Sequence, residues 1–244
     1  MDPQNPQTIA RVFGWFFLAT IITSIPAYFI FYDPVLDDPG LITGAGADPT
    51  ASVAFGAVLE VFLIIANVAT AVVVYPILKR QSEIGAIGYV SARLVEAFFI
   101  AIGIVSLLAF LLMRQEATAD AALGEAFVAI YYRGFLVGPG FFAGLANGLI
   151  LGYLMYRSGL VPRGMAVLGL IGGPLVMASG IAVMFDVAER GGAFQGIAGG
   201  VEGLWELSLS IFCIVKGFRP SSPILAMDRT VRVPESPSAE REEV

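Results

Sequence analysis

Long apolar stretches constrain this chain more than any other feature of its sequence. A helix needs about 20 mostly apolar residues to cross the hydrocarbon core of a bilayer. Six stretches reach that length without the alternation of a barrel strand, namely about Ile9–Phe31, Ala51–Leu78, Ile84–Met113, Glu125–Tyr156, Val161–Phe185 and Phe194–Phe218. Only 14% of the 244 residues are charged, against about a quarter in soluble domains. The sequence therefore predicts an all-α polytopic membrane protein, a bundle of six transmembrane helices within residues 1–218.

Basic residues near the span ends predict the orientation of this bundle. With six spans they fall mainly on one side, as Arg11, Lys79, Arg80, Arg157, Arg163, Lys216 and Arg219. The loop after the first span instead carries Asp33, Asp37, Asp38 and Asp48, without a Lys or Arg. Because Lys and Arg favour the cytoplasmic side, we expect both the N- and C-termini to be cytoplasmic and the protein to lie in the inner (plasma) membrane.

The composition changes after the sixth span. Residues 219–244 hold several prolines and close on charged residues. Such a segment has little apolar surface to bury, so we expect a disordered cytoplasmic tail.

Composition also excludes several kinds of chemistry. The chain has no histidine, which removes histidine-ligated metals and every imidazole base. Its one cysteine, Cys213, cannot form an internal disulfide. We find no phosphate loop, dinucleotide fingerprint or metal-ligand spacing, so no cofactor, metal or catalytic residue is predicted. The net charge of −6 argues against nucleic acid as a partner, and membrane lipids are the expected partners.

Six ionisable residues inside the predicted spans are the candidate buried polar site. They come from four spans and are Glu60, Arg93, Glu96, Arg133, Glu202 and Glu206. At about 1.5 Å per residue, all six fall within one slab in the outer half of the membrane. Charges in a span are costly and need a partner or a wet cavity.

The charge balance of this candidate site is uneven. Arg93 and Glu96 are three residues apart on one helix face and can pair. Glu202 and Glu206 also share a face, and like charges at that spacing repel. With four glutamates and two arginines, full ionisation leaves two negative charges unbalanced. We therefore expect a cluster that holds a proton or a cation, or that opens to water.

Small residues in the fourth span predict close helix packing. Gly140, Gly144, Gly148 and Gly152 recur every fourth residue along one helix face. Such glycines let a neighbouring backbone approach closely. A six-span bundle has internal neighbours, so packing within the chain is favoured over a homodimer, although the oligomeric partner stays unknown. Pro139 predicts a kink in the same span.

Several motifs together resemble a bacterial membrane family. They are the Asn5-Pro6-Gln7-Thr8-Ile9-Ala10-Arg11 segment, Ala92-Arg93-Leu94-Val95-Glu96-Ala97, Gly152-Tyr153-Leu154-Met155-Tyr156-Arg157-Ser158 with Val161-Pro162-Arg163, Glu206-Leu207-Ser208-Leu209 and Lys216-Gly217-Phe218. The chain resembles the domain of unknown function 4386 family over nearly everything except the tail. This resemblance implies a bacterial integral membrane protein and no particular activity.

Three functions remain open at this stage. The six charged residues could line a pocket that binds or transports a small polar or amphiphilic solute. Alternatively the protein is structural or regulatory, and the cluster is an interhelical ion-pair network. An intramembrane enzyme that uses glutamate acid–base chemistry on a lipid is the weakest hypothesis, because it requires a lipid-open groove beside Glu202 and Glu206.

Overall fold

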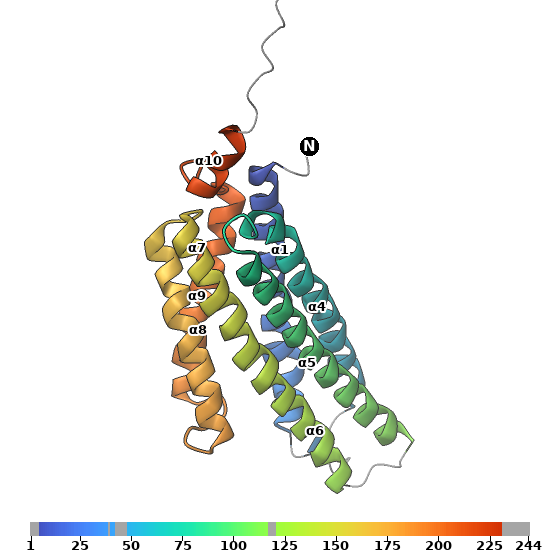
Figure 1. Cartoon of the computed structure of the whole chain (residues 1–244). Coiled ribbons are helices and arrows are strands. Elements are labelled where there is room, and N and C mark those ends of the chain that lie inside the picture. The colour runs from blue at the N-terminus through green and yellow to red at the C-terminus, as the bar shows by residue number, and fades with distance from the viewer. Residues whose placement is uncertain (1–4, 39, 42–47, 117–120, 231–244) are drawn as a thin grey trace, which may run out of the picture.

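The computed structural model describes residues 5–38, 40–41, 48–116 and 121–230. Within these ranges the chain forms helices and no strand, and six helical segments are long and apolar enough to cross a membrane. Figure 1 shows them side by side in one elongated bundle. The predicted all-α class and the predicted six spans are therefore confirmed.

The observed spans agree with the predicted ones to within a few residues. The first span joins α1 (Pro6–Pro26), the π-helical segment η1 (Ala27–Tyr32) and α2 (Asp33–Leu36). The second and third are α4 (Thr50–Leu78) and α5 (Glu83–Gln115). The fourth consists of α6 (Ala121–Phe135), η2 (Leu136–Phe142), η3 (Gly144–Leu151) and α7 (Gly152–Ser158). The last two are α8 (Arg163–Met184) and α9 (Ala193–Val215), and the short α10 (Pro223–Thr230) follows.

Polar residues at the helix ends determine where several spans begin. The Asn5 side chain accepts a hydrogen bond from the Gln7 backbone N–H, at 2.9 Å, and so caps α1. Ser82 caps α5 by accepting from the Gly85 N–H at 3.0 Å. Each cap satisfies a backbone donor that the helix leaves without an internal partner. The spans thus begin at positions specified locally by the sequence.

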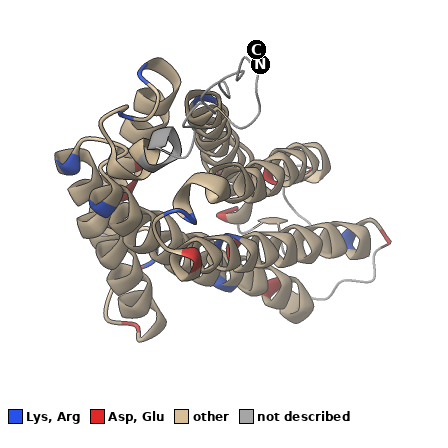
Figure 2. Ribbon diagram, turned by 45° about the horizontal axis from the view of Figure 1, so that its top comes forward, with Lys and Arg blue, Asp and Glu red and all other residues tan. Residues whose placement is uncertain are grey.

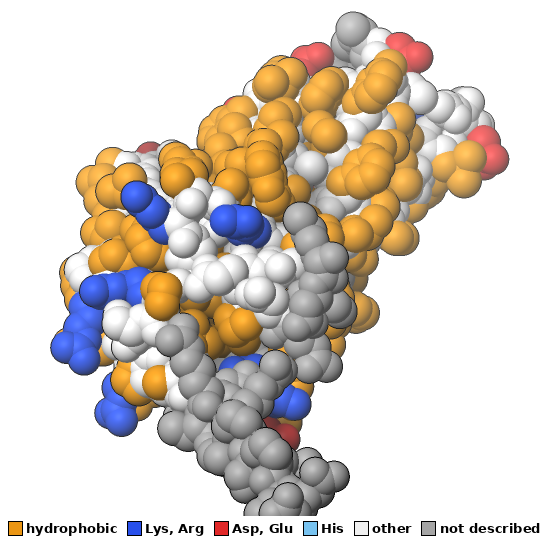
Figure 3. Space-filling model, turned by 90° about the horizontal axis from the view of Figure 1, so that it is seen from above, with side chains coloured by type: hydrophobic (Ala, Val, Ile, Leu, Met, Phe, Trp, Pro, Cys, Tyr) orange, Lys and Arg blue, Asp and Glu red, His pale blue; other side chains and the backbone are white. Residues whose placement is uncertain are grey.

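The two ends of the bundle differ in charge. In Figure 1 the start of α1 and α10 lie at one end, and the end of α5 and the start of α6 lie at the other. Figure 3 views the bundle from the first of these ends, where Lys and Arg side chains gather. Most of each long helix is free of charge (Figure 2). We call these two ends the basic end and the α5–α6 end.

The fourth span widens into π-helix where a kink was expected. Pro139 lies in η2 and has no N–H to donate to the helix. A π-helix bonds each residue to the fifth one along, and this pattern continues through η3. Because the π-helical turns are wider, the residues of the fourth span that follow them point in a different direction around the helix axis than in a continuous α-helix. Asn147 consequently contacts side chains of both α5 and α9.

Glycines of the fourth span pack against α8. A Cβ on Gly144 would stand 2.8 Å from the Gly173 carbonyl oxygen, and a Cβ on Gly148 would collide with the Gly173 Cα. Gly152 lies against the Leu170 backbone N–H in the same way, with 3.2 Å to a built Cβ. These three glycines are therefore used within the chain, as expected. A Cβ on Gly140 would meet only residues of its own span.

The chain beyond residue 218 differs from the expected disordered tail. Residues 223–230 form α10, and Ile224 and Leu225 are buried against the main apolar core. The Ser222 hydroxyl donates to the Ser158 carbonyl oxygen at 2.7 Å, and the Arg219 N–H donates to the Leu160 carbonyl oxygen at 2.8 Å. The prediction was wrong for this stretch because Pro223 begins a helix instead of preventing one. The rest of the predicted tail, 231–244, lies outside the described residues.

Candidate functional site

Arg93 and Glu96 of α5 form a buried ion pair. The Arg93 Nη1 and Glu96 Oε2 atoms are 2.7 Å apart, and the residues are 1% and 5% exposed. Arg93 also donates through Nη2 to the Asn67 side-chain oxygen of α4. The guanidinium carbon lies 5.8 Å from the centre of the Phe17 ring of α1. Arg93 therefore joins three spans, and the expected pairing of residues three apart is confirmed.

Asn147 of η3 is the centre of a second polar group. Its side-chain nitrogen donates to Glu206 Oε1 at 2.6 Å, and its side-chain oxygen accepts from the Tyr89 hydroxyl at 3.3 Å. The Asn147 backbone carbonyl accepts from Trp205 Nε1 at 3.0 Å. Trp205 is fully buried and lies against Gly169. One asparagine therefore links α5, α9 and the fourth span.

Glu202 of α9 is enclosed, and it lacks a hydrogen-bond partner among the residues that the structure describes. The residue is 5% exposed, and neither of its carboxylate oxygens has a partner within the described chain. A Cβ on Gly148 would stand 2.9 Å from Oε1, and a Cβ on Gly172 would collide with Oε2. Two helices thus leave room for this carboxylate only because both carry glycine there. A buried carboxylate without compensation is strongly unfavourable when ionised.

Glu60 of α4 lies in a separate, aromatic environment. It is 6% exposed and accepts a hydrogen bond from the Tyr32 hydroxyl at 3.2 Å. The Tyr32 ring packs edge-on against the Tyr131 ring, with centroids 5.2 Å apart. The Tyr131 hydroxyl is buried without a partner among the described residues. Glu60 is buried as expected. The hydrogen bond that it makes within the described residues is to Tyr32, and not to Arg93.

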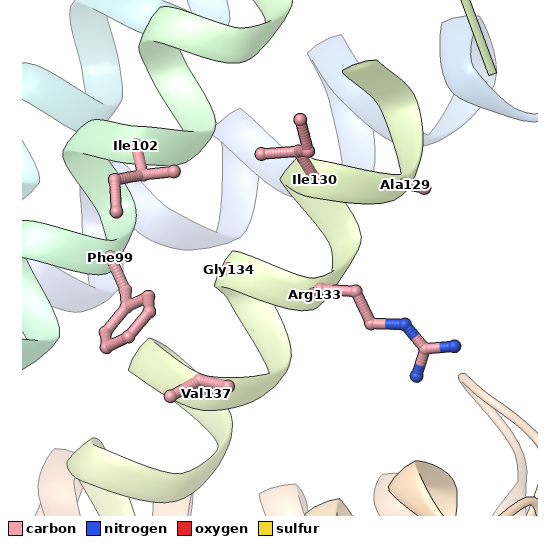
Figure 4. A pocket seen from close by; sticks show the side chains of 7 residues that line it. All are labelled: Phe99, Ile102, Ala129, Ile130, Arg133, Gly134 and Val137. Atoms are coloured by element: carbon pink, nitrogen blue, oxygen red, sulfur yellow. The ribbon is translucent and has the colours of Figure 1, made fainter. Parts of the chain in front are cut away.

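Arg133 of α6 does not join the other five residues. Its side chain is exposed, and it lines a shallow groove with Phe99 and Ile102 of α5. Figure 4 shows the guanidinium pointing away from those two residues. The expectation that Arg133 is buried in the cluster is wrong, because the sequence gives the position along a helix but not which face turns inward.

The predicted slab therefore divides into three parts. We use the name central cluster for Asn67, Tyr89, Arg93, Glu96, Asn147, Glu202, Trp205 and Glu206. Glu60 and Tyr32 form a second buried group, and Arg133 lies on the surface. The six site residues predicted from the sequence did not include Tyr89, Asn67 or Asn147, although the two asparagines were expected to make interhelical hydrogen bonds, and both do. Helical spacing could have identified two of these residues. Tyr89 lies one turn before Arg93 on the same helix face, and Asn67 lies two turns after Glu60.

The central cluster has more acids than bases. Arg93 is its only base among the described residues, against Glu96, Glu202 and Glu206. Full ionisation would leave two negative charges in a buried region where Coulomb repulsion is weakly screened. The described residues contain no group of three acidic or sulfur side chains able to hold a metal ion. Bound protons or cations with a total charge of +2 would balance this arrangement, and one proton or monovalent cation would halve the excess.

The fold and these buried charges define a multi-pass helical membrane protein. The chain belongs to the family described as a domain of unknown function, DUF4386, whose match covers residues 12–217. The resemblance noted in the sequence is therefore confirmed. No curated protein and no solved structure matches the chain significantly. The family description assigns no activity.

Proposed function

We propose that the central cluster binds a small polar or amphiphilic solute, and that Glu202 exchanges a proton or a cation when this occurs. The observation that supports this proposal best is the carboxylate of Glu202, which is buried and has no hydrogen-bond partner among the described residues. If Glu202 served only helix packing, its buried carboxylate would be expected to accept hydrogen bonds from neighbouring groups. An unsatisfied carboxylate among helices is instead available for a ligand.

The surroundings of Glu202 favour exchange of a positive charge. From α9 it faces Glu206, and from α5 it faces Glu96 and Arg93. From η3 and α8 it faces the glycines Gly148 and Gly172, which offer neither charge nor side-chain donor. Two of its three charged neighbours are acids, so a proton or cation at Glu202 relieves repulsion.

The π-helical segments give the site a means of opening. Such segments often occur at functional sites. Asn147 in η3 contacts α5 and α9 at once. A change in the winding of η3 would therefore alter the enclosure of Glu202 and the hydrogen bond to Glu206 together.

Proton movement through reconstituted protein tests this proposal. Liposomes holding the full chain and an internal pH-sensitive dye are given a pH gradient, with and without a panel of small amphiphilic solutes. We expect a flux that Glu202→Gln abolishes, because the amide keeps the shape and cannot release a proton. Glu60→Gln is the matched control and should keep the flux, because Glu60 belongs to a separate group. Equal flux in the Glu202→Gln protein and the unaltered one would contradict the proposal.

Tryptophan fluorescence gives a second readout of the same site. The chain has two tryptophans, so Trp15→Phe leaves Trp205 as the only reporter. Trp205 donates to the Asn147 carbonyl, and Asn147 in turn donates to Glu206. We expect the emission of Trp205 to change across a pH series or on solute addition, and to stop changing in Glu202→Gln. A Trp205 emission that does not respond to either would count against ligand exchange.

A structural network is the second candidate function. It is favoured by Arg93, whose ion pair with Glu96 and hydrogen bond to Asn67 join α4 and α5 in a closed arrangement. This reading predicts that changes in the cluster alter stability and nothing else. Glu202→Gln separates the two, because it should abolish flux only if the cluster exchanges charge. The lipid-enzyme hypothesis is disfavoured, because Glu202 is enclosed by glycines instead of opening to lipid.

The orientation and the membrane also belong to this proposal. We propose that the basic end faces the cytoplasm and that the protein lies in the inner (plasma) membrane of a bacterium. Support comes from the basic residues of the turns after α4 and α7, such as Lys79 and Arg163, because basic loops stay cytoplasmic.

A further inference from the structure

Four buried side-chain atoms of the central cluster have no hydrogen-bond partner among the described residues. Two are acceptors, the carboxylate oxygens of Glu202. Two are donors, namely Nε of Arg93, whose other two nitrogens are engaged, and the side-chain nitrogen of Asn67, which neighbours Glu96. Buried polar groups are seldom left without partners, so a ligand or water has to complete both sides of this arrangement.

Arg93 and Glu202 lie at a similar depth in the bundle. Asn147 joins Tyr89 of α5 to Glu206 of α9, which places those two side chains at one level. Arg93 comes one turn after Tyr89, and Glu202 comes one turn before Glu206. Because α5 runs toward the α5–α6 end and α9 runs away from it (Figure 1), both residues lie about 6 Å on the same side of the Asn147 bridge. Arg93 is also among the charged groups close enough to act on Glu202, so a short molecule with two polar ends would reach both.

The charges of the central cluster select one kind of ligand. Three acids stand against Arg93, which leaves an excess of two negative charges when all are ionised. An ammonium group reduces this excess to one, whereas a carboxylate on the same ligand restores it. A metal ion needs several oxygen ligands, and the described residues contain no group of three acidic side chains able to hold one. An ammonium group instead binds a single carboxylate through its N–H donors.

We propose that the solute of the central cluster is a small amine cation that also carries a neutral acceptor oxygen, such as an amino alcohol. Its ammonium group binds the Glu202 carboxylate, and its hydroxyl oxygen accepts a hydrogen bond from Arg93 Nε. The proton or cation held at Glu202 leaves as the ammonium group arrives. This inference rests on the exchange proposed for Glu202 and names the substrate class of that site.

Calorimetric titration of the purified full chain in detergent tests this substrate class. Short linear amino alcohols are compared with the alkylamines and the ω-amino acids of equal length. The alkylamine lacks the acceptor oxygen, and the amino acid replaces it with a carboxylate. A trimethylammonium alcohol keeps the positive charge without N–H donors. Glu202→Gln removes the partner of the ammonium group, and Glu60→Gln is the matched control, because Glu60 is a buried glutamate bonded to Tyr32 outside the cluster.

We expect an amino alcohol to bind, and the alkylamine and the amino acid of its length to bind at least about fivefold more weakly, in line with a lost charge-assisted hydrogen bond or an added repulsion. The trimethylammonium alcohol should also bind weakly, because it cannot donate to Glu202. Glu202→Gln should abolish binding, and Glu60→Gln should preserve it. Equal binding by any of the three comparison ligands would overturn the proposal, and so would binding retained in Glu202→Gln.

Arg93→Lys tests the second contact, because lysine keeps the positive charge and removes Nε. This variant should bind the amino alcohol no more tightly than the alkylamine, and a retained preference would overturn the contact proposed for Arg93. If the variant does not fold, the ligand series on the unaltered chain still decides.

The titrations also separate this proposal from the exchange on which it rests. If no amine binds while Glu202→Gln still abolishes the proton flux, the substrate class is wrong and the exchange stands. If Glu202→Gln leaves the flux unchanged as well, both proposals fail.

Discussion

At the scale of single residues, the ion pair of Arg93 is the contact whose loss should matter most. Both partners are almost fully buried, and Arg93 joins α1, α4 and α5. Removing one member of a buried pair leaves the other charge uncompensated. The stability of the inner bundle therefore depends on Glu96 as much as on Arg93.

Glu96→Gln should lower the free energy of unfolding by about 3 kcal/mol or more, because it leaves a buried guanidinium without its anion. Thermal unfolding of the detergent-solubilised protein measures this loss. Glu125→Gln, at an exposed position of α6, is the control and should change stability little. If the two variants unfolded at the same temperature, the pair would not stabilise the bundle.

Spacing predicted the Arg93–Glu96 pair, but it could not predict the neighbours of Glu202. Residues three apart on a helix meet wherever that helix lies. Glu202 lies against Gly148 and Gly172, which come from two other helices far away in sequence. Only the packing of α8 on the fourth span determines that this carboxylate has no hydrogen-bond partner in the described part of the chain.

At the scale of helices, glycine determines how closely the fourth span and α8 approach. Gly148 lies against the backbone of Gly173, which cannot move aside as a flexible side chain can. Close approach through small residues is a main source of packing energy between membrane helices. The α8–α9 pair is therefore held in place by the glycines of η3 and α7.

Gly148→Ala should lower the free energy of unfolding by about 1–3 kcal/mol, since an added methyl group overpacks this contact. Gly164→Ala is the matched control in α8, because a Cβ there would meet nothing within 4 Å. Alanine there should be neutral or slightly stabilising. Chemical or thermal unfolding of the two variants compares them directly, and an unchanged Gly148→Ala protein would show that the helices can separate freely.

The start of α4 should respond to acid through Asp48. Its carboxylate accepts hydrogen bonds from the Thr50 hydroxyl at 2.6 Å and the Thr50 N–H at 3.0 Å. These bonds lower the pKa of the exposed Asp48 carboxyl below its usual value. Because the folded pKa is the lower one, the stabilisation is complete above the ordinary aspartate value near about 4 and is lost as pH falls below it.

Hydrogen exchange of the first turn of α4 measures this effect. We expect protection of the Thr50 amide to decrease as the pH falls below about 4, after correction for the intrinsic pH dependence of exchange. Asp48→Asn should remove the decrease, because an amide does not titrate in this range. The same pH profile in both proteins would mean that Asp48 does not stabilise the start of this helix.

At the scale of the whole molecule, charge asymmetry between the two ends should determine orientation. The basic end carries the start of α1, α10 and the turns after α4 and α7. The opposite end carries acids such as Asp33 and Asp37, although Arg190 there lies over the Tyr132 ring. Short loops rich in Lys and Arg resist translocation, so the two ends should face different compartments.

Cysteine labelling of intact cells tests the orientation. In a Cys213→Ser background, Asp38→Cys should react with a membrane-impermeant maleimide, because residue 38 lies at the α5–α6 end. Arg163→Cys should react only after the membrane is permeabilised, because Arg163 begins α8 at the basic end. Labelling in the reverse order would place the basic end outside and overturn the proposed topology.

The sequence by itself determined the helical class, the six spans and the Arg93–Glu96 pair, because hydropathy and helical spacing are local properties of the chain. It could not determine which way each helix turns, since every face of a membrane helix is apolar enough to meet lipid or protein. Tertiary structure alone decided that Arg133 faces outward and that α10 packs on the bundle. It also decided that Glu202 lies between two glycines. These outcomes depend on contacts between distant segments, where the close approach of backbones decides which polar groups have partners.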